Sequence, residues 1–388
     1  MSTPNFAYIN SEVVSWARQR AGLSVGELAA KLKVAEHIIG DWESSAGLPA
    51  FSIAEKLAEE LHIPFGYLFL SKPPKNEIQI PDLRTVGSRQ PSGLSIDFLD
   101  ALKSCLLKQQ WYSEYLQSEG KKPLSFPGSM TMADGLDAVA DEITTTLGIH
   151  DGLRDEAISW EQFKGKLVEA AEKIGILVMQ SGVGANNLRP LSVKEFRGFA
   201  IMDSFAPLVF INSKDAGAAR IFTLIHELAH LWIGKSGISN PELRKRANEQ
   251  PNVIERFCNK VAAEVLVPKR AILKRWNADR PIYENVQTLA RYFRVSRYVA
   301  LRQAYEQDLA TKEEYLSFLD TYPSVWKAVD SDTTGGSFYN TFFARNSKRV
   351  VRAVVKALGR EQITYLEASK LFGVKIGTVK TIAERFGQ

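Results

Sequence analysis

The sequence predicts a mostly helical α+β protein in three parts. These are an N-terminal domain of five short helices around a helix-turn-helix, a central domain with a small sheet and one apolar helix, and a C-terminal helical domain. Three observations favour this organisation. The chain of 388 residues is too long for one simple core. Helical patterns dominate both ends, and three short apolar runs between residues 176 and 213 are typical of strands.

Changes in composition place the domain boundaries. We assign residues 1–70 to the first domain, 71–92 to a linker rich in proline and polar residues, 93–310 to the central domain and 311–388 to a basic C-terminal domain. No apolar run reaches the ~18 residues that a membrane span needs, and the N-terminus lacks a secretory-signal pattern. The 2 cysteines lie far apart and form no disulfide framework. A cytoplasmic location is the default expectation.

The two ends of the chain differ in charge. The net charge is +5, but residues 1–70 carry eight acidic and five basic residues, a net −3. Residues 345–388 carry ten basic and three acidic residues, a net +7. Binding to phosphates requires basic groups, so the C-terminal segment is better suited to contact nucleic acid than the N-terminal one.

Short helices are expected in turn over residues 12–20, 24–32, 35–43 and 52–61. Ser24 is placed to cap the second helix, and Lys33-Val34 form the turn that leads to the third. With Leu28-Ala29, Ile38 and Trp42 at their spacing, this segment resembles the XRE (Cro/CI-type) DNA-binding domain over nearly all of residues 12–70. Domains of this type often dimerise, which makes a homodimer an expected state, although no diagnostic seam is visible.

The expected recognition helix is poorly suited to DNA. It starts with Ala35-Glu36-His37, which offers no arginine, lysine, glutamine or asparagine to bases or phosphates. Glu36, Asp41 and Glu43 would repel the DNA backbone. DNA reading and docking to a protein therefore both remain open for this domain.

The central domain is expected to build its site on one helix. Helices at 96–118, 133–147 and 160–173 precede strands at 176–182, 196–203 and 207–213, and the helix containing HELAH follows. His226 and His230 lie four residues apart, so both imidazoles point to one side of a helix, where they can share a metal ion. Glu227 lies beside the first ligand, placed to accept a proton from a water on the metal. The alternative is a core helix with two satisfied histidines.

A third metal ligand is expected from the helix in VIERFCNKVAAEVLVP. Glu255 and Glu264 are nine residues apart and lie on opposite helical faces, so only one can face the histidines. We choose Glu255 because its face also carries Cys258, Asn259 and Ala262, a small and polar stripe suited to the wall of a site. Cys258 is a second potential ligand, although a small buried cysteine is the more usual interpretation.

HELAH, preceded by Phe222-Thr223-Leu224 and followed by E-x-x-C-N-x-x-A-A-E-x-L-x-P, resembles the ImmA/IrrE family of metallopeptidases. The resemblance covers about residues 12–310, including the fused XRE domain. It implies a zinc-dependent endopeptidase with His226, His230 and Glu255 as zinc ligands and Glu227 as the catalytic base. Family members act on XRE-type repressors in phage, mobile-element and stress responses, which implies a repressor or toxin-type regulator as substrate.

The C-terminal segment repeats the helix-turn-helix pattern. Helices are expected at 365–372 and 375–386, with Gly373-Val374 at the turn. Lys375, Thr378, Lys380 and Thr381 cluster near the start of the second helix, which favours a nucleic-acid or acidic-partner surface. The alternative is a helical bundle that packs on the peptidase.

The sequence therefore predicts a regulatory zinc endopeptidase with a DNA-binding-type domain. Two alternatives remain open. One is a DNA-binding regulator or antitoxin whose peptidase fold acts as a sensor or docking module, and the other is an inactive scaffold with structural zinc. Because both histidines and the glutamate base are present, the enzyme is favoured.

Overall fold

The computed structural model describes residues 5–74, 95–184, 190–239, 253–322 and 337–386. Most of the predicted linker, 71–92, lies outside this range. The chain divides into two compact units, one reaching into helix α5 as far as Leu99 and the other running from Asp100 onward. Among the described residues, no helix is both long and apolar enough to cross a membrane.

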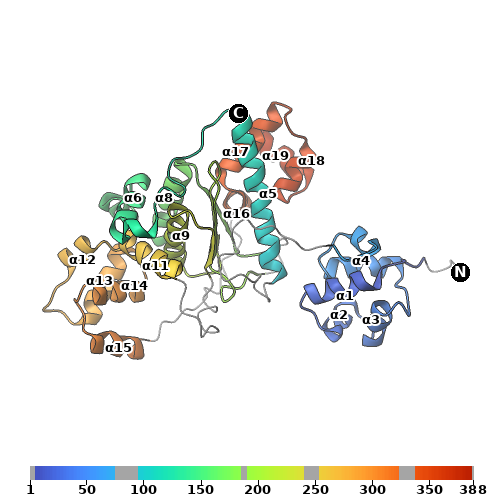
Figure 1. Ribbon diagram of the computed structural model, residues 1–388, viewed down its shortest axis with the longest axis horizontal. Coiled ribbons are helices and arrows are strands. Elements are labelled where there is room, and N and C mark those ends of the chain that lie inside the picture. The colour runs from blue at the N-terminus through green and yellow to red at the C-terminus, as the bar shows by residue number, and fades with distance from the viewer. Residues whose placement is uncertain (1–4, 75–94, 185–189, 240–252, 323–336, 387–388) are drawn as a thin grey trace. The chain divides into compact units, whose positions relative to one another are not determined.

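The N-terminal unit contains the five expected helices, the last of them a 3-10 helix. Ser24 and Glu27 form a reciprocal capping box at the start of the second helix, and Lys33 ends that helix with a left-handed φ of 57°. The core is formed by fully buried side chains from every helix, among them Val14, Leu28 and Ile39. The helices are α1 (Ser11–Arg20), α2 (Val25–Leu32), α3 (Glu36–Glu43), α4 (Phe51–Glu60) and η1 (Phe65–Phe69) (Figure 1).

One of the three acidic groups expected to repel DNA is neutralised inside this unit. Arg18 of α1 donates from Nε and Nη2 to the two carboxylate oxygens of Glu43, at 2.6 and 2.9 Å. Both side chains are about 15% exposed, and Arg18 also donates to the carbonyl of Leu23. The expectation that Glu43 repels phosphates was therefore wrong, because its charge fixes α3 to α1.

The second unit is built on a four-stranded sheet with the order β1-β3-β2-β4. β1 and β3 are parallel, whereas β2 runs antiparallel to both β3 and β4. The three strands expected from the sequence are present, and β4 was missed because its three residues are too few for a periodic pattern. The strands are β1 (Leu177–Ser181), β2 (Gly198–Ile201), β3 (Leu208–Asn212) and β4 (Gly237–Ser239).

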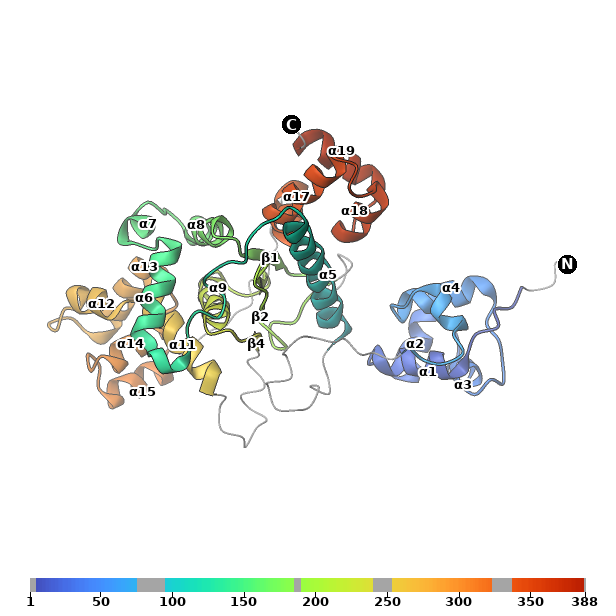
Figure 2. The same cartoon turned by 45° about the horizontal axis from the view of Figure 1, so that its top comes forward.

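The sheet lies between α9 on one face and α5 on the other (Figures 1 and 2). Val209 and Ile211 of β3 belong to the core cluster that includes α9. The intervening Phe210 points to the opposite face, where its ring stacks on Phe199 with centroids 4.8 Å apart. Gln109 of α5 is buried and donates to the carbonyls at both ends of the β2–β3 turn, which fixes α5 to the sheet.

Helix α11 packs along both α9 and α6 and joins them in one continuous core. Phe318 of α15, beyond the predicted boundary at residue 310, belongs to this core. The helices of this part are α5 (Ile96–Ser118), η3 (Met132–Asp134), α6 (Leu136–Leu147), α7 (Asp151–Asp155), α8 (Trp160–Lys173), α9 (Gly217–Trp232), α11 (Val253–Leu266), α12 (Lys269–Arg275), α13 (Ile282–Phe293), α14 (Arg297–Glu306) and α15 (Lys312–Thr321).

The C-terminal helices are anchored on the central sheet, because α16 packs against β1. Glu172 of α8 accepts hydrogen bonds from the Ser347 hydroxyl at 2.6 Å and from the Lys348 amide at 3.1 Å, and so caps the start of α17. Burial raises the pKa of Glu172, while these donors oppose the shift. The helices are α16 (Phe338–Asn346), α17 (Lys348–Gly359), α18 (Tyr365–Phe372) and α19 (Ile376–Phe386).

Several of the basic residues counted in the C-terminal segment serve this anchoring. Lys356 of α17 and Arg360, directly after it, contact the carboxylate of Glu119, the residue that follows α5, at 3.3 and 2.9 Å. Arg349 donates to the carbonyl of Glu172 at 2.6 Å. The net +7 of the segment therefore overstates its uncompensated charge, because Glu119, which lies outside the segment, pairs with two of these residues.

Replacing Glu172 by alanine should lower the free energy of unfolding by about 2–3 kcal/mol, because the buried Ser347 hydroxyl and the Lys348 amide at the start of α17 lose their acceptor. Urea unfolding followed by circular dichroism measures the loss. Glu169→Ala is the matched control on the same helix. Its carboxylate is exposed and lies 3.5 Å from Lys348, so a change within about 0.5 kcal/mol is expected. Equal losses for the two variants would contradict the capping role of Glu172.

Candidate metal centre

The site is built on α9, a helix with an almost entirely buried surface. From Thr223 to Trp232 every residue is buried, including His226, Glu227 and His230 at 3%, 0% and 1% exposure. The apolar neighbours explain why this segment lies between the sheet and α11. Three ionisable groups in such a position require partners or a ligand, because burying an uncompensated charge is costly.

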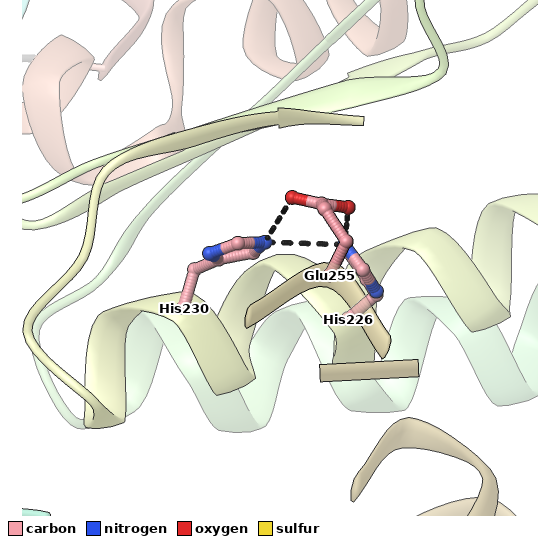
Figure 3. Close-up of side chains that lie close together, drawn as sticks. All are labelled: His226, His230 and Glu255. Carbon is pink, nitrogen blue, oxygen red and sulfur yellow. Dashed lines mark hydrogen bonds and ion pairs between the residues drawn. The ribbon is translucent and has the colours of Figure 1, made fainter. Parts of the chain in front are cut away.

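The structure brings together the three predicted ligands (Figure 3). His226 and His230 lie on successive turns of α9, and Glu255 reaches them from α11. The two imidazole Nε2 atoms are 3.2 Å apart. The carboxylate oxygens of Glu255 lie 3.3 Å from Nε2 of His226 and 3.1 Å from Nε2 of His230.

These separations fit a tetrahedral metal ion. Bonds of about 2.0–2.1 Å at tetrahedral angles place two ligand atoms about 3.3 Å apart. The 3.2 Å between the two nitrogens is close to this separation, and each nitrogen faces a different oxygen of Glu255, with His226 3.3 Å from Oε2 and His230 3.1 Å from Oε1. The two imidazoles and the carboxylate therefore converge from two helices, as the protein ligands of one metal ion do.

The charge state of Glu255 also suits a metal ligand. Burial by itself raises the pKa of this carboxyl, but hydrogen bonds with the two imidazoles, and their charge, outweigh burial and hold the pKa well below its usual range. The side chain of Glu255 is 22% exposed, whereas those of His226 and His230 are at most 4% exposed. Glu255 is thus the member of this group closest to solvent.

Glu227 lies against β2 rather than within the ligand triangle. Gly198 is the first residue of β2. A Cβ at this position would lie 3.0 Å from Oε1 of Glu227 and 2.7 Å from the carbonyl oxygen of Phe210. The carboxylate is also near Cys258, whose pKa is raised well above its usual value by burial and by the charges of Glu255 and Glu227. Glu227 therefore borders the centre without joining the three ligands.

The two glycines that touch the site were not singled out in the sequence. A Cβ on Gly237 of β4 would lie 2.7 Å from the ring of His230, and a Cβ on Gly198 would lie 3.0 Å from the carboxylate of Glu227. Glycine within a strand indicates a close approach of another group, so Gly198 in FRGFAIMD carried a usable signal. Gly237 carried none, because β4 itself was not predicted.

Glu264, the carboxylate that was not chosen as a ligand, has another role. Glu264 faces away from the histidines and accepts hydrogen bonds from the Lys269 amide at 2.9 Å and from Gln303 at 3.3 Å. Among the described residues the metal-competent group comprises two histidines and Glu255, and Cys258 is not part of it.

Comparison with known families agrees with this geometry. Residues 171–305 match the family model of the IrrE N-terminal-like domain, Peptidase_M78. Much of the central domain is thus similar to M78 peptidases. Residues 14–68 match a helix-turn-helix family model, so both expected resemblances are confirmed in the expected order. No curated protein is similar enough to match the chain.

In the central domain, replacing Gly237 by alanine should weaken the affinity for a divalent metal by about 10- to 100-fold, because the new methyl group displaces the His230 ring. Competition with a chelating dye measures the affinity. The matched control is Gly165→Ala on α8, where a Cβ meets nothing within 4 Å. An unchanged affinity in the Gly237 variant would show that the ring position does not limit metal binding.

Proposed function

We propose that this protein is a zinc-dependent regulatory endopeptidase that cleaves a repressor, a toxin or another regulatory protein. The observation that carries the proposal is the convergence of His226, His230 and Glu255, with the two imidazole nitrogens 3.2 Å apart and one carboxylate oxygen within 3.3 Å of each. Two histidines and one carboxylate are a ligand set found in catalytic zinc sites that keep one position open. The proposal includes the domain boundaries at 1–70, 71–92, 93–310 and 311–388.

The side chains around this centre have separate tasks. His226, His230 and Glu255 would hold the metal. Zinc at this position lowers the pKa of water and polarises a peptide carbonyl. Glu227 accepts the proton of the attacking water and passes it to the leaving amine. Gly198 leaves room for this carboxylate, because a Cβ at that position would approach Oε1 of Glu227 to 3.0 Å.

A second candidate function rests on the helix-turn-helix match at residues 14–68. In this alternative the protein is a DNA-binding regulator or antitoxin, and the M78 domain binds metal only to sense or to dock. The two functions differ in one observable, because only the first requires peptide hydrolysis that depends on Glu227.

The purified protein is expected to contain close to one zinc ion per chain, and His226→Ala should lose it because two ligands hold zinc poorly. Mass spectrometry under native conditions and elemental analysis measure the content. His150→Ala is the matched control, since this histidine caps α7 away from the ligand triangle. Protein purified without chelators that carries no transition metal would eliminate the enzymatic function.

Three glutamate variants should separate ligand from base. Glu227→Gln should keep zinc and lose proteolysis, because an amide cannot take up the proton of water. Glu255→Gln should weaken zinc binding, since a neutral amide oxygen is a poorer ligand than a carboxylate. Glu264→Gln is the control and should change neither, because an amide oxygen can still accept from Lys269.

Zinc stoichiometry and intact-mass detection of fragments measure these outcomes, with regulators and toxins encoded beside this protein as substrates. Loss of zinc in Glu264→Gln together with its retention in Glu255→Gln would refute the third ligand. Fragments produced equally by the native protein and by Glu227→Gln would refute the base. Zinc binding without fragments from any neighbouring regulator would favour the sensor function.

A further inference from the structure

The described chain contains three helix-turn-helix units with the same local geometry. In each, the first helix ends at a left-handed residue that is followed by a valine. The left-handed residues are Lys33, Arg294 and Gly373, with φ of 57°, 56° and 65°. The units are α2–α3, α13–α14 and α18–α19. Their second helices differ in exposure and charge, and these differences decide which of them can enter a DNA groove.

The second helix of the middle unit, α14, is unsuited to DNA because it is packed inside the central domain. Val299, Ala300, Leu301 and Ala304 are buried along it. Gln303 is also buried and donates to the carbonyl of Val267 at 3.0 Å. A helix with these contacts cannot leave them to enter a groove.

The N-terminal and C-terminal units match residue by residue without a gap. Residues 24–46 align with 364–386, and both first helices begin with a capping box, Ser24 with Glu27 and Thr364 with Glu367. Ile39 and Trp42 are buried on α3, and Val379 and Ile382 are buried at the equivalent positions of α19. The two units therefore present the same face of their second helix outward.

The two units carry opposite net charges. Residues 24–46 contain four acidic and two basic residues, whereas 364–386 contain four basic and two acidic residues. On α3 the outward positions include Glu36 and Asp41. On α19 and at its start, Lys375 and Lys380 are exposed.

The surroundings of α19 also suit a polyanion. Ile376 and Thr381 are exposed beside the two lysines, so one side of the helix is free along its length. Lys380 lies 5.9 Å from the ring of Tyr365 at the start of α18. In helix-turn-helix proteins the first helix crosses the sugar-phosphate backbone at this place. Tyr365 is 42% exposed and can donate its hydroxyl to a phosphate.

We propose that α19 is the DNA-contacting helix of this protein. It lies in the major groove, with Lys375 and Lys380 against phosphates, and the C-terminal unit rather than the family-matched N-terminal unit supplies the affinity for DNA. The inference rests on the surface of α18 and α19 and is independent of the metal centre. It leaves α3, with its acidic face, to contact protein.

A hollow of about 530 Å³ lies beside α19, and an acidic peptide in this hollow is the alternative to DNA. Phe338 and Tyr339 of α16 line it together with Thr378 and Thr381 of α19. Aromatic rings beside lysines also suit an acidic peptide. Duplex DNA is favoured because the outward face matches that of a recognition helix, which a peptide site does not require.

The test is fluorescence anisotropy of the full-length protein with a mixed-sequence duplex three helical turns long, over a series of salt concentrations. The variant Lys375→Gln/Lys380→Gln should bind roughly tenfold more weakly at low salt, and its slope of log affinity against log salt should shrink by roughly 1.8, about 0.9 for each lost phosphate contact. The matched control is Lys269→Gln/Lys274→Gln on α12, which removes the same charge from two exposed lysines and should change neither quantity.

Weakening confined to the α19 pair supports the proposal. An unchanged affinity and slope in that pair would overturn it, as would equal weakening by the α12 pair, since the effect would then be one of net charge. A native protein that binds a poly-glutamate peptide but not the duplex at the same salt concentration would also overturn it, in favour of an acidic protein partner. Circular dichroism melting checks that both variants fold.

Discussion

The central constraint on this structure is the burial of three ionisable side chains on one apolar helix. His226, Glu227 and His230 are at most 3% exposed on α9. Such groups are tolerated inside a protein when partners compensate for the lost water. Glu255 supplies one partner from α11, and the sheet presents glycines where larger residues would displace the carboxylate and the ring. The packing of α11 on α9 and the placement of β2 and β4 both follow from this requirement.

The parts of the site that depend on local geometry were predictable from the sequence. Four residues between two histidines fix their common direction on any helix, and nine residues between Glu255 and Glu264 fix their opposite directions. The helices at 96–118 and 160–173 were also predicted with their observed bounds, because periodic apolar residues and clear ends define them. The contact of Gly237 with His230 was not predictable, because a three-residue edge strand exists only through pairing with β2.

Charge counts along the sequence were less reliable than periodicity. The C-terminal segment looked uniformly basic, yet the partner of Lys356 and Arg360 is Glu119, and that of Ser347 is Glu172. These partners are separated by 175 or more residues, and no local pattern indicates them. No local pattern indicates the pairing of Arg18 with Glu43 in the N-terminal unit either. A count of charged residues therefore gives the net charge of a surface only after residues paired with distant parts of the chain have been left out.

The three helix-turn-helix units share one turn geometry, but their second helices have different roles. A left-handed residue followed by a valine ends the first helix in each case, because a left-handed residue satisfies the backbone at the corner. What the second helix does is determined by residues that leave the turn unaffected. Buried apolar residues fix α14 in the core. Acidic residues lie on the outward face of α3, and exposed lysines lie on α19 and at its start. A family match to the turn therefore identifies the fold of α2–α3, whereas the ability to hold DNA depends on the outward residues, and these favour α19.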